Sequence, residues 1–543
     1  MGLPSDPRAC YLQCLVAVEG SYLKSLHLAD AFAEAVSRGP DRPFLVSGAR
    51  RLSYAQTDRE ARALAASLRD LGIGAGHRIA TVLPNCPEAI ITLLAAARLG
   101  AVIVPVNPAL AYHELQYQLR HAGVPLAVSV TTWEGRDYLE WFEDLTEEMP
   151  ELRHVVAVGG DDDVWYEDRV VGWQTLVSGD PPEVRVPSDP GASLAILYTS
   201  GTAGKPKGVC LTHRGLVGNA VETAETLGVV AGDIALLAVP HFTVFGTSVI
   251  LGAIAAGATL VLQGSFQAGA AVRLMAQERV TLCHGVPTMF ALLLREKDFT
   301  HEMLPALRTG IIAGSPVAPD LVRQVLPVCN VEIAYGLTET GPTVTMTRLG
   351  DPHALRQGSV GRPLEGVELR IVDLGEGTLH GTEAVGELAV RSPAVMTGYD
   401  RMPVETRRVF SEDGFFMTGD LALLDADGFV RIVGRRKETI IRGGFNVHPR
   451  EVEDVLRAHP AISDVCVIGV AHDVLGEMIC ACVVPVEGAA VRSEDVIAFA
   501  RDGMADYKVP DLVRFVDGFP LNASGKVQRR ELARSVVPLQ PAS

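Results

Sequence analysis

The chain has 543 residues, 48% of them hydrophobic and 21% charged, so it is long enough for at least two domains with sizeable cores. Its formal net charge of −17, without a long run of Lys or Arg, argues against a nucleic-acid partner. The nine cysteines show neither a CxxC pair nor the spacing of a zinc site, which favours free thiols in a reducing cytoplasm over a disulfide framework.

The first part of the chain alternates helical and strand periods, which predicts parallel α/β layers. The predicted elements are, in chain order, a helix over 52–71, a strand over 78–83, a helix over 87–99, a strand over 101–106 and a helix over 114–121. The charged stretch 134–151 is predicted to be a surface excursion. After about Phe410, Gly, Asp and Arg become concentrated in short turns, and the final segment from Gly434 to the end is predicted to be a compact α+β unit.

Two apolar stretches are long enough to be weighed as membrane spans. The first, 89–106, contains Arg98 and breaks at Gly100, and the second, 248–262, is interrupted by two glycines. Neither reaches the uninterrupted length that a bilayer requires, so each is predicted to be a buried helix followed by a strand. The first twenty residues lack the basic start and apolar core of a signal peptide. We therefore expect a cytoplasmic protein with no membrane span.

The strongest chemical signal is the segment 198–208, YTSGTAGKPKG, which follows a predicted strand over 193–197. Its three glycines, four hydroxyls and two lysines can direct N–H groups, hydroxyls and positive charge at anionic oxygens. It is not a Walker A loop, because two residues rather than four separate Gly201 from Gly204 and Pro206 follows the lysine. Taken alone, the segment could equally be a flexible surface loop.

Other segments follow this one in a fixed order. They are AYGLTE at 334–339, TGD at 418–420, GRRK at 434–437, IRGGFNVHPREVE at 441–453 and NASGK at 522–526. Together they resemble the signatures of the adenylate-forming superfamily, which contains acyl- and aryl-CoA synthetases, luciferases and the adenylation domains of peptide synthetases. The resemblance covers roughly residues 27–535.

The resemblance implies an α/β fold with two domains. A large N-terminal AMP-binding domain, 1–433, would consist of layered α/β subdomains and a small barrel-like part, with residues 1–26 as a possible extension. A small mobile α+β domain, 434–543, would follow and move about a hinge near Lys437, with the active site between the two domains.

The same resemblance implies a set of site residues. Those expected to bind ATP or AMP are Thr199, Ser200, Gly201, Thr202, Gly204, Lys205, Lys207, Gly314, Ser315, Pro316, Tyr335, Gly336, Asp420 and Arg435. Glu339 would be the Mg²⁺ ligand, because a carboxylate oxygen suits that hard ion, and Thr338 would bind the α-phosphate. Lys526 would stabilise negative charge in the transition state. Gly443 and Gly444 would line the channel for CoA.

The expected acid pocket begins at 240–246, PHFTVFG, which resembles the family pattern Pro-x-aromatic-His-x-aromatic-Gly. Thr243 stands where many acyl-CoA synthetases carry His, and His241 lies two positions earlier, either as a pocket residue or as a structural group. The remaining candidates for the pocket wall are Phe242, Phe245, Val249, Met289 and Val344. Such an apolar wall favours an aryl or medium-chain acid over an amino acid.

These observations predict an AMP-forming, ATP-dependent acid–CoA ligase with ATP, Mg²⁺ and CoA as its reactants and cofactors. Three alternatives stay open at this point. The activated acid could pass to a carrier protein or an amine, and Thr243 leaves room for a different anion such as nitrite, activated for joining to an aromatic amine. The third is a scaffold that binds nucleotide without catalysis, which the presence of Lys526, Glu339 and Asp420 disfavours. Formation of a homodimer is also left open.

Overall fold

A computed structural model describes residues 25–159, 169–179, 181, 184, 189–199, 205–373, 384–442, 445–472, 475–521 and 527–536. The chain forms two compact units. The first contains Met1–Gln357, Gly361–Glu368 and Val390–Phe416, and the second contains Gly358–Val360, Leu369–Ala389 and Met417–Ser543. The second unit thus includes strand segments that precede residue 434, and the predicted boundary of a mobile domain at that residue stays a prediction.

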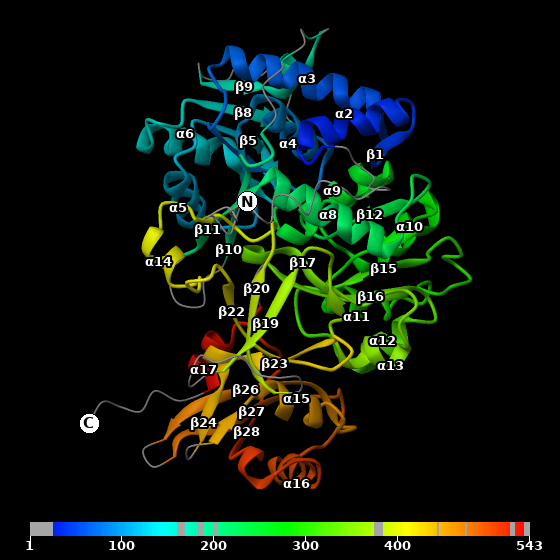
Figure 1. Cartoon of the computed structure of the whole chain (residues 1–543), viewed down its shortest axis with the longest axis vertical. Helices are drawn as coiled ribbons and strands as arrows, with labels where there is room; N and C mark the ends of the chain where they lie inside the picture. Colours follow the sequence, from blue (N-terminus) through cyan, green and yellow to red (C-terminus); the bar gives the residue numbers. More distant parts are fainter. Residues whose placement is uncertain are drawn as a thin grey trace, which may run out of the picture. The chain divides into compact units, whose positions relative to one another are not determined.

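The first unit contains a sheet of nine strands (Figure 1). In spatial order these are β18 (Arg362–Pro363), β17 (Gly341–Met346), β16 (Asn330–Leu337), β15 (Thr309–Ile312), β14 (Leu282–Cys283), β12 (Ile234–Leu237), β13 (Thr259–Leu262), β1 (Pro43–Ser47) and β2 (Arg50–Ser53). The run from β16 to β1 is parallel, and β17, β18 and β2 are antiparallel additions at its edges.

A second sheet in the same unit has eight strands. In order they are β21 (Gly398–Tyr399), β11 (Lys207–Thr212), β10 (Ser193–Thr199), β4 (Val102–Val106), β3 (Arg78–Val82), β5 (Leu126–Val130), β8 (His154–Val158) and β9 (Val170–Gly172). The strands from β10 to β9 are parallel, whereas β11 and β21 are antiparallel. The central strands β4 and β5 are buried at every residue, as expected for parallel strands covered on both faces.

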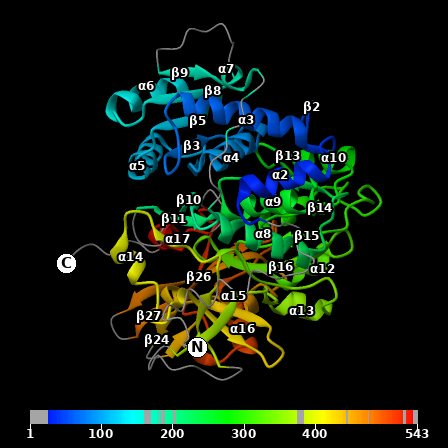
Figure 2. The ribbon, with the colours of Figure 1, turned by 45° about the horizontal axis from the view of Figure 1, so that its top comes forward.

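Three largely buried helices belong to the core of this unit: α4 (Pro87–Leu99), α8 (His213–Leu227) and α9 (Val244–Ala256). Both α4 and α8 contact strands of both sheets, so they lie between them. The helices α8 and α9 lie side by side (Figure 1, Figure 2). Since α9 is buried from Gly246 to Ala256, its uniform hydrophobicity reflects an interior position. Gly257 ends α9 at φ +73°, a left-handed conformation that glycine adopts without strain.

The remaining helices of the chain up to residue 407 are shorter or more peripheral. They are α2 (Leu28–Arg38), α3 (Tyr54–Asp70), α5 (Tyr112–Ala122), α6 (Tyr138–Glu148), α7 (Trp173–Val177), α10 (Ala268–Glu278), α11 (Pro287–Leu293), α12 (Pro319–Val325), α13 (His353–Gly358) and α14 (Pro403–Arg407), with the 3-10 turn η1 (Thr338–Thr340) and the small pair β6 (Thr132–Trp133) and β7 (Arg136–Asp137). The five elements predicted over 52–121 are confirmed by α3, β3, α4, β4 and α5.

The prediction for 134–151 was wrong. Most of that stretch is α6, which buries Tyr138, Phe142 and Leu145 on one face. Asp137 caps this helix by accepting hydrogen bonds from the backbone N–H groups of Leu139 and Glu140. The many acidic residues mark the solvent face of an amphipathic helix, and the spacing of its apolar residues, three and four apart, carries the signal that the charge obscured.

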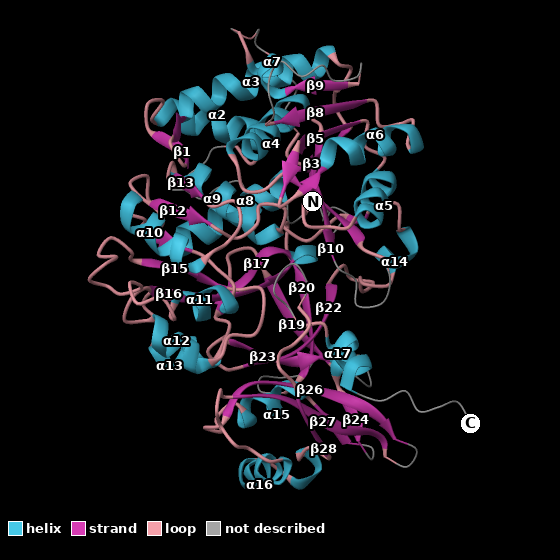
Figure 3. Ribbon diagram, turned by 180° about the vertical axis from the view of Figure 1, so that it is seen from behind, coloured by secondary structure: helices cyan, strands magenta, loops and turns pink. Residues whose placement is uncertain are grey.

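The second unit contains two further sheets, of which Figure 3 shows the strands. One has four strands, β19 (Glu368–Val372), β20 (Gly386–Arg391), β22 (Phe416–Leu424) and β23 (Val430–Arg435). The other has β25 (Phe445–Val447), β24 (Ile440–Arg442), β27 (Gly476–Pro485), β26 (Ile462–His472) and β28 (Leu512–Phe515), accompanied by α15 (Pro449–Leu456), α16 (Ser493–Gly503), α17 (Arg529–Val536) and the turns η2 (Arg436–Glu438) and η3 (Asp506–Lys508). The predicted α/β class, with a large N-terminal part and a smaller α+β C-terminal part, is confirmed.

Within the described residues, no helix has both the length and the apolar character needed to cross a bilayer. The cysteines in this part of the chain, Cys86, Cys210, Cys283, Cys329, Cys466, Cys480 and Cys482, are all free thiols.

Candidate active site

The segment 198–208 is the predicted phosphate loop. Its two ends belong to the antiparallel strands β10 and β11. Thr199 pairs with Lys207 across this hairpin, and Tyr198 pairs with Gly208. The Lys205 ammonium lies 5.1 Å from the centre of the Tyr117 ring. The Tyr117 hydroxyl in turn donates to the Pro206 carbonyl oxygen at 3.1 Å. The hairpin therefore places Thr199, Lys205 and Lys207 together at one end of two rigid strands, where positive charge can meet a polyanion.

Tyr399 links this hairpin to the second signature. Its hydroxyl donates to Glu339 Oε1 at 3.1 Å, and the Lys207 ammonium lies 4.5 Å from the centre of its ring. Burial, together with the neighbouring Glu339 carboxylate, raises the pKa of the Tyr399 phenol, so the group stays protonated and donates at neutral pH. One tyrosine thus brings a candidate metal ligand and a candidate phosphate-binding lysine to the same place.

The backbone around Tyr399 is fixed on both sides. Tyr399 pairs with Val209 of β11, and the Asp400 N–H donates to the Gly208 carbonyl oxygen at 2.7 Å. The Asp400 carboxylate is buried and forms an ion pair with Arg78, whose Nη2 lies 2.7 Å from Asp400 Oδ1. This support locks the segment that carries Tyr399 against the strand that leaves the phosphate loop.

The loops that follow the parallel strands meet at one edge of the nine-stranded sheet. Neighbouring strands β12, β14, β15 and β16 are parallel, so their carboxyl ends lie together. The segments that follow them are 240–246, 284–287, 314–316 and 338–340. Ligands of open α/β sheets bind at this edge. Gly314, Ser315 and Pro316 therefore lie beside the start of η1, which contains Thr338 and Glu339.

Two glycines in this region have a structural reason, one a close contact and the other a left-handed backbone conformation. A Cβ at Gly336 would lie 2.2 Å from the Pro342 carbonyl oxygen, so no larger residue fits between β16 and β17. Gly314 has φ +90°. Tyr335, next to Gly336, is half-buried near the end of β16, and its contact with adenine stays a prediction.

The acid-pocket segment uses its polar residues locally. The Thr243 hydroxyl accepts from the Gly246 N–H at 3.1 Å and donates to the Pro240 carbonyl oxygen at 2.8 Å, so it caps α9. His241 is buried, with Nδ1 3.3 Å from Asn85 Oδ1, and burial lowers its pKa to about 4. His241 lines a small separate cavity together with residues of the eight-stranded sheet. The Phe242 ring packs edge-on against the His241 ring.

A larger cavity lies between α8, α9 and the nine-stranded sheet, with about 450 Å³ of space free of atoms, open solvent included. Phe245 and Val249, two of the predicted pocket residues, line it, and their contact with an acid stays a prediction. Met289 and Val344 are buried but are not among its lining residues, and their contact with an acid stays a prediction. Thr343, the neighbour of Val344 in β17, lines the cavity instead, because successive side chains of a strand face opposite sides.

Family models match most of the chain. The model described as AMP-binding enzyme matches residues 32–400, and the model described as AMP-binding enzyme C-terminal domain matches residues 451–526. The chain belongs to the AMP-binding enzyme family. The membership that the sequence motifs indicated is confirmed.

Named relatives of this AMP-binding enzyme cover nearly all of it. It is 33% identical to the mitochondrial medium-chain acyl-CoA ligase ACSF2 of Mus musculus, over 94% of this chain and 88% of that protein. It is also 33% identical to 4-coumarate–CoA ligase 2 of Oryza sativa subsp. japonica, over 91% of this chain and 89% of that protein. Among solved structures, ATP-bound MatB from Rhodopseudomonas palustris superposes with a TM-score of 0.86 at 30% identity, covering 93% of this chain and 98% of that one.

In the second unit of this AMP-binding enzyme, the predicted ribose residues are paired. Asp420 lies opposite Arg435 in the β22–β23 ladder, and Arg435 Nε is 2.8 Å from Asp420 Oδ1. The Asp420 carboxylate is buried, and its backbone N–H donates to the Thr418 hydroxyl at 3.0 Å. Lys437, the predicted hinge residue, is exposed in η2.

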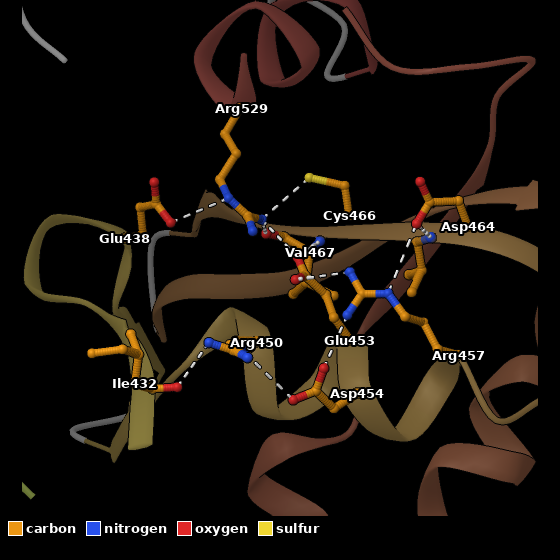
Figure 4. A network of polar contacts seen from close by, with 11 residues as sticks. Ile432, Glu438, Arg450, Glu453, Asp454, Arg457, Asp464, Cys466, Val467 and Arg529 are labelled. Atoms are coloured by element: carbon orange, nitrogen blue, oxygen red, sulfur yellow. Dashed lines mark hydrogen bonds and ion pairs between the residues drawn. The ribbon is translucent and has the colours of Figure 1, made fainter. Parts of the chain in front are cut away.

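A network of polar contacts around the buried Glu453 joins four elements of the second unit, α15, α17, β26 and η2 (Figure 4). Arg529 Nη1 on α17 donates to Glu453 Oε1 on α15 at 2.7 Å and to the Val467 carbonyl oxygen on β26 at 2.6 Å. Its Nε lies 3.2 Å from Glu438 Oε2, one residue beyond Lys437. Burial alone would raise the pKa of Glu453, but the Arg529 guanidinium outweighs it and holds the pKa below the ordinary range. The network fixes the start of α17 in this unit.

Seven of the predicted site residues lie outside the described residues: Ser200, Gly201, Thr202, Gly204, Gly443, Gly444 and Lys526. Sequence reasoning also missed two residues that the structure brings into the site, Tyr399 and His284. A Gly-Tyr-Asp triplet at 398–400 could have drawn attention to the first, whereas His284 belongs to none of the motifs quoted above.

Proposed function

We propose that this AMP-binding enzyme is an ATP-dependent acid–CoA ligase. In the first step, a carboxylate oxygen bonds to the α-phosphorus of ATP while the bond from that phosphorus to the bridging oxygen breaks, and pyrophosphate leaves. In the second step, the CoA thiol loses its proton, its sulfur bonds to the acyl carbon, and AMP leaves with the bonding electrons of the carbon–oxygen bond. The observation that supports this most is the meeting of Lys207 and Glu339 at Tyr399.

The proposed roles of the residues follow from their chemistry. ATP would bind through Thr199, Lys205 and Lys207 at the phosphates, Gly314, Ser315, Pro316, Tyr335 and Gly336 at the adenine, and Asp420 and Arg435 at the ribose, with Ser200, Gly201, Thr202 and Gly204 completing the phosphate loop. Asp420 suits the ribose because a carboxylate accepts from two hydroxyls at once. Thr338 would donate to the α-phosphate. Lys526 would stabilise the charge that develops as the carboxylate attacks. Lys437 would be the hinge, and Gly443 and Gly444 would admit CoA.

The carboxylate at the proposed metal position is a suitable ligand for Mg²⁺. Proteins commonly hold this ion through one or two carboxylates together with substrate phosphates, rather than in a cage of protein ligands. Glu339 provides such a carboxylate beside Lys207. In the described part of the chain, no three His, Cys, Asp or Glu residues gather as a separate metal cage. When bound, the ion would neutralise phosphate charge and so favour attack by an anion.

The proposed acid is a medium-chain or aryl carboxylic acid that enters the cavity lined by Phe245 and Val249. Much of the helical wall consists of small apolar residues, including Ala220, Ala224 and Gly252. The named relatives include a medium-chain acyl-CoA ligase and a 4-coumarate–CoA ligase, which supports this class of acid. Since these relatives are CoA ligases, they do not favour transfer to a carrier protein or an amine, or activation of nitrite.

The test is release of pyrophosphate from ATP and Mg²⁺ with a panel of medium-chain, aryl, amino and inorganic acids, each with and without CoA. We expect release with medium-chain or aryl acids and a thioester only when CoA is present. Lys526→Ala should abolish release, while Lys297→Ala, an exposed lysine outside the proposed site, should not change it. Release without a thioester would move the acceptor to a carrier protein or amine, and unchanged release by Lys526→Ala would overturn the mechanism.

A further inference from the structure

The cavity between α8, α9 and the nine-stranded sheet has an apolar end and an end that contains His284. Ala235 of β12 pairs with Leu282 of β14 near the start of both strands, and both residues line it. His284, which also lines it, comes two residues after Leu282, about 7 Å further along at a strand's rise per residue. The cavity therefore runs from an apolar end at Ala235 to His284 at the carboxyl edge, where the catalytic loops leave the sheet.

His284 is firmly placed at that end. The backbone of the next residue, Gly285, forms a parallel bridge with Ile312 of β15. The His284 ring packs edge-on against Phe245, with ring centres 6.5 Å apart. Only 6% of the residue is exposed. The imidazole is thus held between a strand and the first turn of α9, facing a space that the chain leaves unfilled.

One ring nitrogen of His284 has no hydrogen-bond partner within the described residues. His284 Nδ1 is buried and unpaired, and among the described residues that line the cavity no other has a buried side-chain nitrogen or oxygen in this state. A buried, unpaired polar atom is destabilising, and native proteins leave few of them. Its place on a cavity wall suggests that the missing partner is a ligand.

The ring is suited to a neutral partner. Burial lowers the pKa of His284 to about 4, so at neutral pH it carries one N–H donor and one acceptor nitrogen. A hydroxyl oxygen can bind either nitrogen, and a keto oxygen can accept from the N–H. A hydrocarbon chain would leave the ring unsatisfied.

The polar residues of the segment 240–246 do not line this cavity. His241 Nδ1 lies 3.3 Å from Asn85 Oδ1, and its Nε2 is buried and, like His284 Nδ1, has no partner among the described residues, but His241 lines the separate small cavity. The Thr243 hydroxyl caps α9. The Thr223 hydroxyl, on the cavity wall, donates to the Asn219 carbonyl oxygen at 2.7 Å. The imidazole available to the acid is therefore that of His284, not the one in the signature segment.

We propose that His284 makes the acid pocket selective for medium-chain acids that carry a hydroxyl or keto oxygen on the part of the chain nearer the carboxyl group. This inference rests on the proposed acid–CoA ligase function. The apolar end at Ala235 and Leu282 receives the hydrocarbon tail, while His284 pairs with the oxygen. An unsubstituted acid binds in the same place but leaves the imidazole without a partner.

The test compares acids in matched pairs by kcat/KM for pyrophosphate release. Octanoic acid is paired with its 2-hydroxy, 3-hydroxy, 4-hydroxy and 3-oxo derivatives, and cinnamic acid with its hydroxylated forms. The wild-type enzyme is compared with His284→Leu, which removes both nitrogens, and with His284→Gln, which keeps a donor and an acceptor. His301→Leu, at an exposed position outside the cavity, is the matched control.

We expect one oxygen-bearing acid to exceed its parent by roughly 10-fold to 100-fold in wild-type kcat/KM, the range for one buried hydrogen bond. His284→Leu should reduce this ratio to near one, His284→Gln should keep part of it, and His301→Leu should keep all of it. Equal kcat/KM within every pair in the wild-type enzyme, or an unchanged ratio in His284→Leu, would overturn the inference while leaving the ligase function intact. If the folded wild-type enzyme released no pyrophosphate with any of the acids, both the ligase function and this inference would be overturned.

Discussion

Tyr399 allows a sharp test of the phosphate site, because its hydroxyl and its ring act on different groups. The hydroxyl donates to Glu339 Oε1 at 3.1 Å, and the Lys207 ammonium lies 4.5 Å from the centre of the ring. Tyr399→Phe keeps the ring and removes only the donor. A hydrogen bond to a charged group contributes about 1.5–3 kcal/mol, and because Glu339 is half-buried and water can partly replace the phenol, the lower figure applies. We expect roughly a 10-fold loss in kcat/KM for ATP.

Tyr399→Leu also removes the ring, and a cation–π contact of about 1 kcal/mol adds a further loss of roughly fivefold. The assay is pyrophosphate release at saturating acid with ATP varied. Tyr138→Phe is the control, since it removes a buried hydroxyl that donates to the Pro108 carbonyl oxygen and takes no part in the contacts of Tyr399 with Glu339 and Lys207, and it should lower Tm without changing kcat. If both Tyr399 variants kept wild-type kcat and KM for ATP, the role given to Tyr399 would be refuted.

Three further predictions concern other parts of the chain. Asp420→Asn, which replaces one carboxylate acceptor at the proposed ribose site by an N–H donor, should raise KM for ATP about 10-fold in the same assay, and an unchanged KM would contradict that role. The pKa of Glu453 is lowered from its ordinary 4.5, so near that pH the unfolded chain binds more protons than the folded one. Glu453 therefore stabilises the fold above pH 4.5, and this contribution disappears as the pH falls through the folded-state pKa. Arg529→Met should cost about 3–5 kcal/mol in urea unfolding at pH 7, and a much smaller loss would show that Glu453 does not depend on its partner. Gly336→Ala places a Cβ 2.2 Å from a carbonyl oxygen of the facing strand and should destabilise the enzyme by about 2 kcal/mol or more, whereas Gly350→Ala, with open space around it, should leave Tm nearly unchanged.

The sequence predicted most accurately those elements whose limits are set by local chemistry. The helix predicted over 87–99 is α4, which begins at Pro87 and ends before Gly100 in the left-handed conformation. The strand before the phosphate loop was predicted over 193–197 and extends to Thr199. In both cases the apolar pattern and the residues that begin or end the element agree. The prediction for the acidic stretch that contains α6 was wrong because the charged residues of its solvent face obscured the apolar spacing of the other face.

The site could be predicted only where its residues form contiguous motifs. Glu339 and Lys207 belong to such motifs, but Tyr399, which touches both, comes from a distant segment that pairs with β11. Sequence spacing contains no information about that contact. Thr243 was noted as a departure from the family pattern, and its role as the cap of α9 became visible only from the geometry of its hydroxyl.

In the proposed function, the small residues along the wall of the large cavity limit the length of the acid, and several of these residues also belong to the hydrophobic core. A Cβ added at Gly252 would meet Ala224 and Ala220 only at 3.6 and 3.7 Å, which is ordinary contact, so larger side chains can grow into the cavity from α9. Each buried methylene gained there would stabilise the fold by roughly 0.8 kcal/mol and shorten the space for substrate. Selection for thermal stability and selection for long substrates would therefore act on the same positions in opposite directions.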